Sequence, residues 1–268
     1  MSDGAIRFTA KLKGSSDVAR LLHRYPDKVG RTLESLVRQE ARGLAVELAR
    51  DTRPFGFGDK ARKLGEKAVA KDIIKVYATP EQAFSSAMGA DMTQADRFWA
   101  AIQNRRFAQA KKALAASQSK WNTLPVGRLD PALHQQSRTG PHANVKRREP
   151  AQVVTSKKAL DAYIAKVQKR VGFAKGVWIN AAKAIGGRVR GAAQWSTRHR
   201  QAPGTARVRT GDKPAVTLES RLDYMEQVTT ATGIELALTV AAGRLRKALA
   251  TSLRKVADGV NRGFRRAG

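Results

Sequence analysis

The side chains of this sequence that could do chemistry are mostly basic, and half of the excess charge lies in the middle of the chain. Residues 131–210 hold 17 Lys and Arg against 2 Asp and Glu, in a chain whose net charge is +29. A guanidinium group binds a phosphate or a carboxylate through two parallel hydrogen bonds, so these residues are suited to binding anions. The candidate contact residues are Lys146, Arg147, Arg148, Arg188, Arg190, Arg198, Arg200, Arg207 and Arg209.

Two kinds of partner fit such a surface. One is the phosphate backbone of double-stranded DNA, contacted without reading its sequence. The other is an acidic protein that meets a solvated basic face. Trp195 lies among the arginines, where it could stack on a base or support the loop. No helix-turn-helix, zinc-finger or RNA-recognition signature is present, so we expect no sequence-specific binding.

The sequence contains no motif that indicates enzymatic chemistry. There is no cysteine, which excludes a thiolate nucleophile, a disulfide and a Cys-based zinc site. The four histidines show no H-x-x-x-H or H-E-x-x-H spacing, and no phosphate-binding G-x-x-x-x-G-K-[ST] loop or G-x-S-x-G motif occurs. The Gly56–Lys60 segment has two glycines but lacks the following Ser or Thr, as expected of a plain turn. We therefore expect no enzyme, no catalytic residue, no metal and no cofactor.

The hydrophobic pattern predicts an α+β fold, mainly helical, with a small antiparallel sheet and a long C-terminal helix. Residues Ile6–Leu12 alternate apolar and polar, which is typical of a half-buried strand. We expect this strand to pair with Lys71–Ala78 or with a strand of a neighbouring subunit. Further short strands are predicted near 152–155, 206–209 and 215–218. Helices are predicted near 27–51, 91–117, 156–171 and 173–185, with Ser156 as a cap.

A single long helix is predicted at the C-terminal end of the chain. From Gly233 to Phe264 it would measure ~48 Å at 1.5 Å per residue. Its apolar stripe consists of Leu238, Leu245, Leu249, Val256, Val260 and Phe264. We expect this stripe to pack against another subunit, and the alternative is that it lies across the chain's own helices. No apolar run approaches the ~18 residues of a membrane span, and the first ten residues do not resemble a signal peptide.

Four segments follow from these patterns. Residues 1–80 form a strand-helix-helix-strand core, and residues 81–150 a helical insertion with a basic arm. Residues 151–218 form the basic middle region, and residues 219–268 the long helix. We expect them to belong to one α+β domain with insertions.

The order of these elements resembles a known family. A strand is followed by "SSDVARLLHRYPDKV", "RTLESLVRQEARGLAVELARDTRPFG" and, after a loop, "KDIIKVYA". This is similar to the small neck or tail-completion proteins of tailed bacteriophages, which begin with a strand, two helices, a Pro/Gly loop and a return strand. The stretch "FAKGVWINAAKAIGGRVRGAAQW" also resembles longer minor-tail and head–tail joining proteins. The insertion around 85–150 and the long last helix depart from the short family members.

The resemblance implies a structural virion protein, in the neck, in tail completion or in a head–tail connector. It implies a ring of identical copies around the DNA channel, in contact with neighbouring head or tail proteins. The protein would then lie in the virion, and in the host cytoplasm during assembly, without membrane contact. The alternative is a sequence-independent nucleic-acid-binding protein, packaged with the genome or acting on it.

Overall fold

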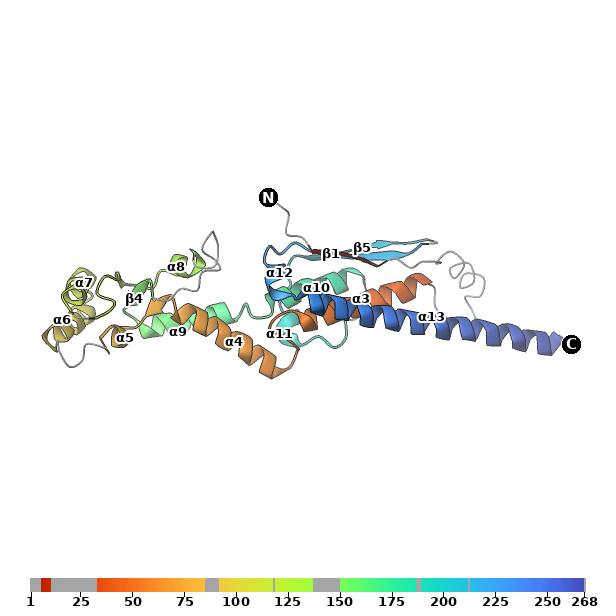
Figure 1. Ribbon diagram of the computed structural model, residues 1–268, viewed down its shortest axis with the longest axis horizontal. Helices are drawn as coiled ribbons and strands as arrows, with labels where there is room; N and C mark the ends of the chain where they lie inside the picture. Colours follow the sequence, from red (N-terminus) through yellow and green to blue (C-terminus); the bar gives the residue numbers. More distant parts are fainter. Residues whose placement is uncertain are drawn as a thin grey trace. The chain divides into compact units, whose positions relative to one another are not determined.

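The structure is a computed structural model that describes residues 6–10, 33–84, 92–117, 119–136, 150–186, 189–211 and 213–267. It is mainly helical, with a small antiparallel sheet and a long C-terminal helix, and this confirms the predicted fold class (Figure 1). The chain forms two compact units. Unit 1 comprises residues 1–65 and 171–268, and unit 2 comprises residues 66–170.

The antiparallel sheet of unit 1 joins distant parts of the chain. It contains β1 (Ile6–Ala10), β5 (Gly204–Arg209) and β6 (Ala215–Ser220), in the order β1-β6-β5. Because β1 pairs with β6, the predicted pairing of Ile6–Leu12 with Lys71–Ala78 is wrong. Residues 71–74 are helical, and only Tyr77–Ala78 forms a strand, in the sheet of unit 2.

Three helices form the core of unit 1 with this sheet. They are α3 (Leu33–Asp51), α10 (Phe173–Ala184) and α13 (Ala231–Ala267). Helix α3 packs against α10, α13 and β6, and α10 also contacts β5. The fully buried side chains of Trp178 and Leu218 lie in this core. Two short helices, α11 (Gln194–Thr197) and α12 (Met225–Val228), complete the unit.

Arg244 links α13 to α3. Its Nε donates to Oε2 of Glu40 at 3.2 Å, and its Nη1 donates to Oε1 of Glu47 at 3.3 Å. Gly43 of α3 leaves room for the guanidinium group, because a Cβ there would lie 2.9 Å from Nη2 of Arg244. A small residue on one helix therefore allows an ion pair across the contact.

The predicted stripe of α13 coincides only in part with the side that faces the core of unit 1. Leu245 and Leu249 lie against the chain's own core, which is the alternative to packing on another subunit. Ala237, Ala241 and Leu249 are buried against unit 1, and Leu245 is partly buried there. Leu238 is exposed. The side chains of Val256, Val260 and Phe264 lie outside the described residues. The alanines face the core because small side chains let two helices approach closely, so a count of large apolar residues locates this face poorly.

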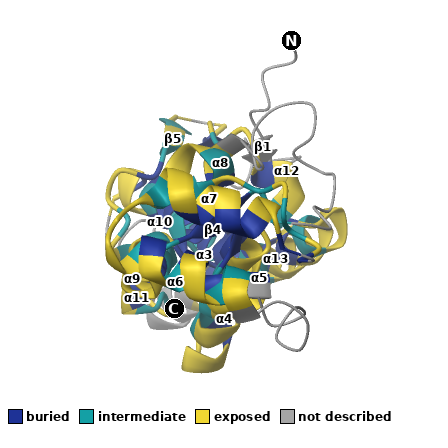
Figure 2. Cartoon of the chain, turned by 90° about the vertical axis from the view of Figure 1, so that its left-hand side faces the viewer, coloured by how far each residue is buried: buried dark blue, intermediate teal, exposed yellow. Residues whose placement is uncertain are grey.

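Unit 2 contains a second small sheet. Its central strand confirms the strand predicted near 152–155, whereas its parallel pairing was not predicted. Strand β4 (Gln152–Val154) lies between β2 (Tyr77–Ala78) and β3 (Val126–Gly127), and both pairings are parallel. All of β4 is buried (Figure 2). Around the sheet lie α5 (Pro80–Phe84), α6 (Met92–Gln103), α7 (Phe107–Ala115), α8 (Pro131–Gln136) and α9 (Lys157–Gln168); α4 (Asp59–Ile74) leads into the unit.

Two helix boundaries test the sequence patterns directly. Ser156 caps α9 as predicted, since its Oγ accepts a hydrogen bond from the Ala159 N–H at 3.2 Å. The single helix predicted over 91–117 is wrong, because α6 and α7 are separated by a turn. Arg105 in that turn has φ of 55°, a left-handed conformation that interrupts a helix.

Candidate nucleic-acid interface

The loop that contains Arg198 and Arg200 is fixed on helix α10. The side-chain amide of Asn180 donates to the carbonyl oxygens of His199 and Arg200, both at 3.1 Å, and of Ala202 at 2.8 Å. One amide nitrogen therefore holds three carbonyl groups of the four-residue segment 199–202 on α10. This anchoring gives the loop's arginines a defined position on the surface.

A hydrogen bond to the backbone restrains the side chain of Arg198. Its Nη2 donates to the carbonyl of Val171 at 3.3 Å, and Nε2 of His199 lies 2.9 Å from the same oxygen. Burial lowers the pKa of His199, while the Val171 hydrogen bond acts in the opposite direction. Arg198, which is exposed like Arg200, therefore holds part of the loop in place.

Strand β5 presents a second set of basic side chains at the edge of the sheet. Thr205, Arg207 and Arg209 are exposed, and the residues between them are partly buried toward the core. Alternate strand residues lie ~6.6 Å apart on one face, so the two arginines can meet successive charges of an extended polyanion. Arg209 also donates from Nε to the carbonyl of Lys213 at 3.0 Å.

The start of β5 requires glycine. A Cβ at Gly204 would lie 1.8 Å from the carbonyl oxygen of Val177 in α10. The backbone of the strand thus touches the backbone of the helix, which fixes the height of β5 above α10. This contact sets the position of Arg207 and Arg209.

The structure brings most of the described candidate arginines to exposed positions in unit 1. Arg190, Arg200, Arg207 and Arg209 are exposed and form no ion pair with the residues that the structure describes. Their charges are therefore available to an anion. Lys146, Arg147, Arg148 and Arg188 lie outside the described residues.

Trp195 supports the fold and is not placed to stack on a base. Its side chain is buried, with 9% of its surface exposed, and its Nε1–H donates to the carbonyl of Phe57 at 2.9 Å. Gly172 lies against the indole, because a Cβ there would be 2.7 Å from Cε3 of the ring. Of the two roles considered for this tryptophan, the supporting one is the one seen.

A buried lysine beside Trp195 was missed by sequence reasoning. Lys175 has no exposed surface, and its Nζ donates to the carbonyls of Ala49 and Thr52 at 2.6 Å and of Arg50 at 3.2 Å. Its three N–H donors thus satisfy carbonyl groups at and just beyond the C-terminus of α3. Its one sequence signal is a lysine inside the apolar run 173–185.

The surroundings of Lys175 oppose its charge. Burial lowers the pKa of Lys175 to about 7, although nearby Asp51 acts in the opposite direction. Nζ lies 5.2 Å from the centre of the Phe57 ring and 5.7 Å from that of Trp195, which favours the cation. Burial also raises the pKa of Asp51. The group joins α3, α10 and the 52–58 loop, which is a structural role.

The part of the chain that the structure describes holds no group of three or more His, Asp or Glu placed to bind a metal. His134, which is buried, has its Nδ1 3.0 Å from the Tyr163 hydroxyl and its Nε2 3.3 Å from Oδ2 of Asp72. Its ring therefore belongs to a hydrogen-bond network inside unit 2. Among the described residues, no helix is both long enough and apolar enough to cross a membrane.

Comparison with family models, with curated proteins and with solved structures gives no match for this chain.

Proposed function

We propose that the protein is a structural component of a tailed-bacteriophage particle, in the neck, in tail completion or in the head–tail connector. Copies of the chain would form a ring around the DNA channel and contact neighbouring head or tail proteins. The proposal combines the geometry of α13 and the charge of the surface with the N-terminal pattern up to the helix that ends at Asp51. The return strand of that pattern gives no support, because residues 71–74 are helical and β1 pairs with β6.

The length of α13 is the main support for this proposal. The helix has 37 residues, which is ~55 Å, whereas α3, against which it packs, has 19 residues, or ~28 Å. Of the α13 residues whose side chains are described, Ser252 is the last that is buried. The helix continues for 15 residues after Ser252, and of these the described side chains, at 253–255 and 257–258, are exposed or half-buried. Such an extension is suited to packing on another subunit. Leu236, Leu238 and Val240 add exposed apolar surface near its start.

The experiment is to disrupt the gene in the phage or prophage that encodes this chain and to examine the particles. We expect the protein in purified wild-type particles by mass spectrometry and at the head–tail junction or tail by immunogold electron microscopy. Particles without it should show heads and tails unattached, or tails incomplete. Normal infectious particles from the disrupted gene, with no copy of the protein in wild-type particles, would refute the proposal.

The second candidate function is sequence-independent binding of nucleic acid. The exposed Arg200, Arg207 and Arg209, without ion-pair partners in the described part of unit 1, favour it. In a virion these residues would face DNA or an acidic neighbour. Binding of the purified chain to DNA, without a place in the particle, would favour this second function over the first.

A further inference from the structure

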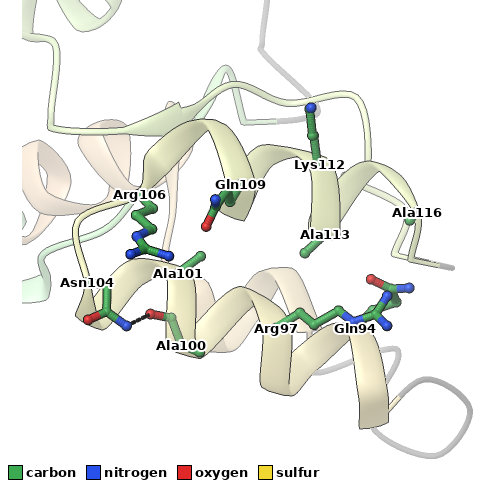
Figure 3. Close-up of a pocket in the computed structure, with 10 residues that line it drawn as sticks. All are labelled: Gln94, Arg97, Ala100, Ala101, Asn104, Arg106, Gln109, Lys112, Ala113 and Ala116. Carbon is green, nitrogen blue, oxygen red and sulfur yellow. Dashed lines mark hydrogen bonds between the residues drawn. The ribbon is translucent and has the colours of Figure 1, made fainter.

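Unit 2 has a basic groove between two helices. The groove lies between α6 and α7, has a volume of about 510 Å³, and has four alanines among its lining residues (Figure 3). Its polar lining consists of three cations and three amides, namely Arg97, Arg106, Lys112, Gln94, Asn104 and Gln109, with no acidic residue. We refer to these side chains together as the α6–α7 groove.

The cations of the groove are not used inside the described part of unit 2. Arg97 and Arg106 are exposed, and neither takes part in an ion pair or a side-chain hydrogen bond with the described residues. In Figure 3 the side chains of Gln109 in α7 and of Arg106, the residue before α7, extend toward α6, whereas the amine of Lys112 is directed away. The two guanidinium groups are therefore the charges that an anion in the groove would meet.

The lining favours a carboxylate-bearing polypeptide over a nucleic acid. Single-stranded nucleic acid is held largely by stacking its bases on aromatic rings, and no aromatic residue lines the groove. Side-chain amides both donate and accept hydrogen bonds, as peptide groups do, and a guanidinium group forms paired hydrogen bonds with a carboxylate. The alanines leave space for a turn of another chain.

The chain itself contains a turn with this chemistry. Residues 211–240 hold 5 acidic and 2 basic residues, in contrast to the positive charge of the segments on either side. Asp223 and Glu226 in this segment are both exposed, and neither forms an ion pair with the described residues. Asp223 lies in the turn that precedes α12, and Glu226 lies in the first turn of that helix. Met225 between them is fully buried, which fixes the turn on unit 1.

We propose that the α6–α7 groove of one copy binds the acidic turn Asp223–Glu226 of a second copy. The inference rests on the proposed function, because it gives the contact by which copies join. A chain with a net charge of +29 repels its copies, and a contact between a basic groove and an acidic turn opposes that repulsion. Such a contact joins two different surfaces, and contacts of this type close into rings when the rotation allows.

The test reverses the charges and measures self-association of the purified full chain by sedimentation at ~50 mM salt, where charge interactions are weakly screened. R97E/R106E and D223K/E226K should each weaken association by about tenfold or more. An equimolar mixture of the two variants should associate again, because the acidic groove of one meets the basic turn of the other. This rescue distinguishes the contact from an unspecific effect of net charge.

Matched controls change the same number of charges elsewhere. K111E/K158E and E81K/D161K alter exposed residues outside the groove and the turn, and each should leave self-association unchanged. Circular dichroism should show that every variant is folded, since all the altered side chains are exposed. Absence of association in the wild-type chain, or association unchanged by both reversals, would overturn the proposal.

Loss of DNA binding in R97E/R106E with association unchanged would assign the groove to nucleic acid and also overturn it. The particle experiment is independent of this measurement. If the protein is found in particles but its charge-reversed variants associate normally, only the proposed contact is refuted. If copies associate through this contact but the protein is absent from particles, only the virion location is refuted.

Discussion

Replacing Lys175 by methionine should destabilise unit 1 by an amount that grows with pH. The substitution removes the donor to the carbonyls of Ala49, Arg50 and Thr52 and keeps a long apolar side chain in the site. An unsatisfied buried acceptor lowers the free energy of unfolding by ~1–3 kcal/mol. Removing a buried charge raises it again in part, because the charge no longer has to be desolvated. We therefore expect the free energy of unfolding at pH 6 to fall by ~1–2 kcal/mol.

The pH dependence follows from the lowered pKa of Lys175. Burial lowers it from 10.5 to about 7, so between these values the unfolded chain holds a proton that the folded chain has lost. The free energy of unfolding of the wild type should therefore rise with pH through this window, by up to ~1.4 kcal/mol per pH unit. Methionine does not titrate, so the difference between wild type and K175M should grow by up to ~3 kcal/mol from pH 7 to pH 9.

The assay is urea unfolding at pH values from 6 to 9, followed by tryptophan fluorescence. Trp178 and Trp195 lie in unit 1, and a W99F/W121F background removes the tryptophans of unit 2. K183M is the matched control, because Lys183 lies exposed on the same helix. A difference between wild type and K175M that stays constant with pH would refute the proton argument. A K175M variant more stable than wild type at pH 6 would refute the role of the carbonyl contacts.

Three further predictions concern the backbone, the basic surface and the last helix. In G204A the free energy of unfolding, measured with urea, should fall by ~2–3 kcal/mol, because the new Cβ would clash with the Val177 carbonyl of α10. In G243A it should rise by ~0.5–1 kcal/mol, because Gly243 lies in the interior of α13 with open space around it. R200A/R207A should reduce the slope of log K against log salt for duplex DNA by ~1.8, one phosphate contact per arginine, and an unchanged slope would exclude these residues from the interface. A chain ending at residue 253 should keep unit 1 folded by circular dichroism, and one ending at residue 237 should lose it, since the latter lacks Ala241 and Leu249 of the core. Equal stability of the two shortened chains would contradict this placement of α13.

Local patterns in the sequence determined much of the secondary structure. Period-3.6 apolar spacing located α3, α9, α10 and α13, because an amphipathic helix buries one face wherever its partner lies. The Ser156 cap depends on a hydrogen bond three residues away, so it too could be read from neighbours in the chain. The abundance of exposed arginine in residues 189–211 follows in the same way, because desolvating unpaired charges is costly.

Tertiary structure alone decided the features that depend on distant residues. The β-branched residues Ile73, Ile74 and Val76 fit a strand, yet residues 71–74 end helix α4. Packing of Ile73 and Val76 in unit 2 outweighs this intrinsic preference. The pairing of β1 with β6 joins segments about 210 residues apart, and no local pattern specifies which strands meet. In the sequence, Lys175 is distinguished only by its position among the apolar residues of 173–185, which does not identify its partners. Only the packing of α10 against the end of α3 buries its charge and gives its ammonium group three carbonyl partners.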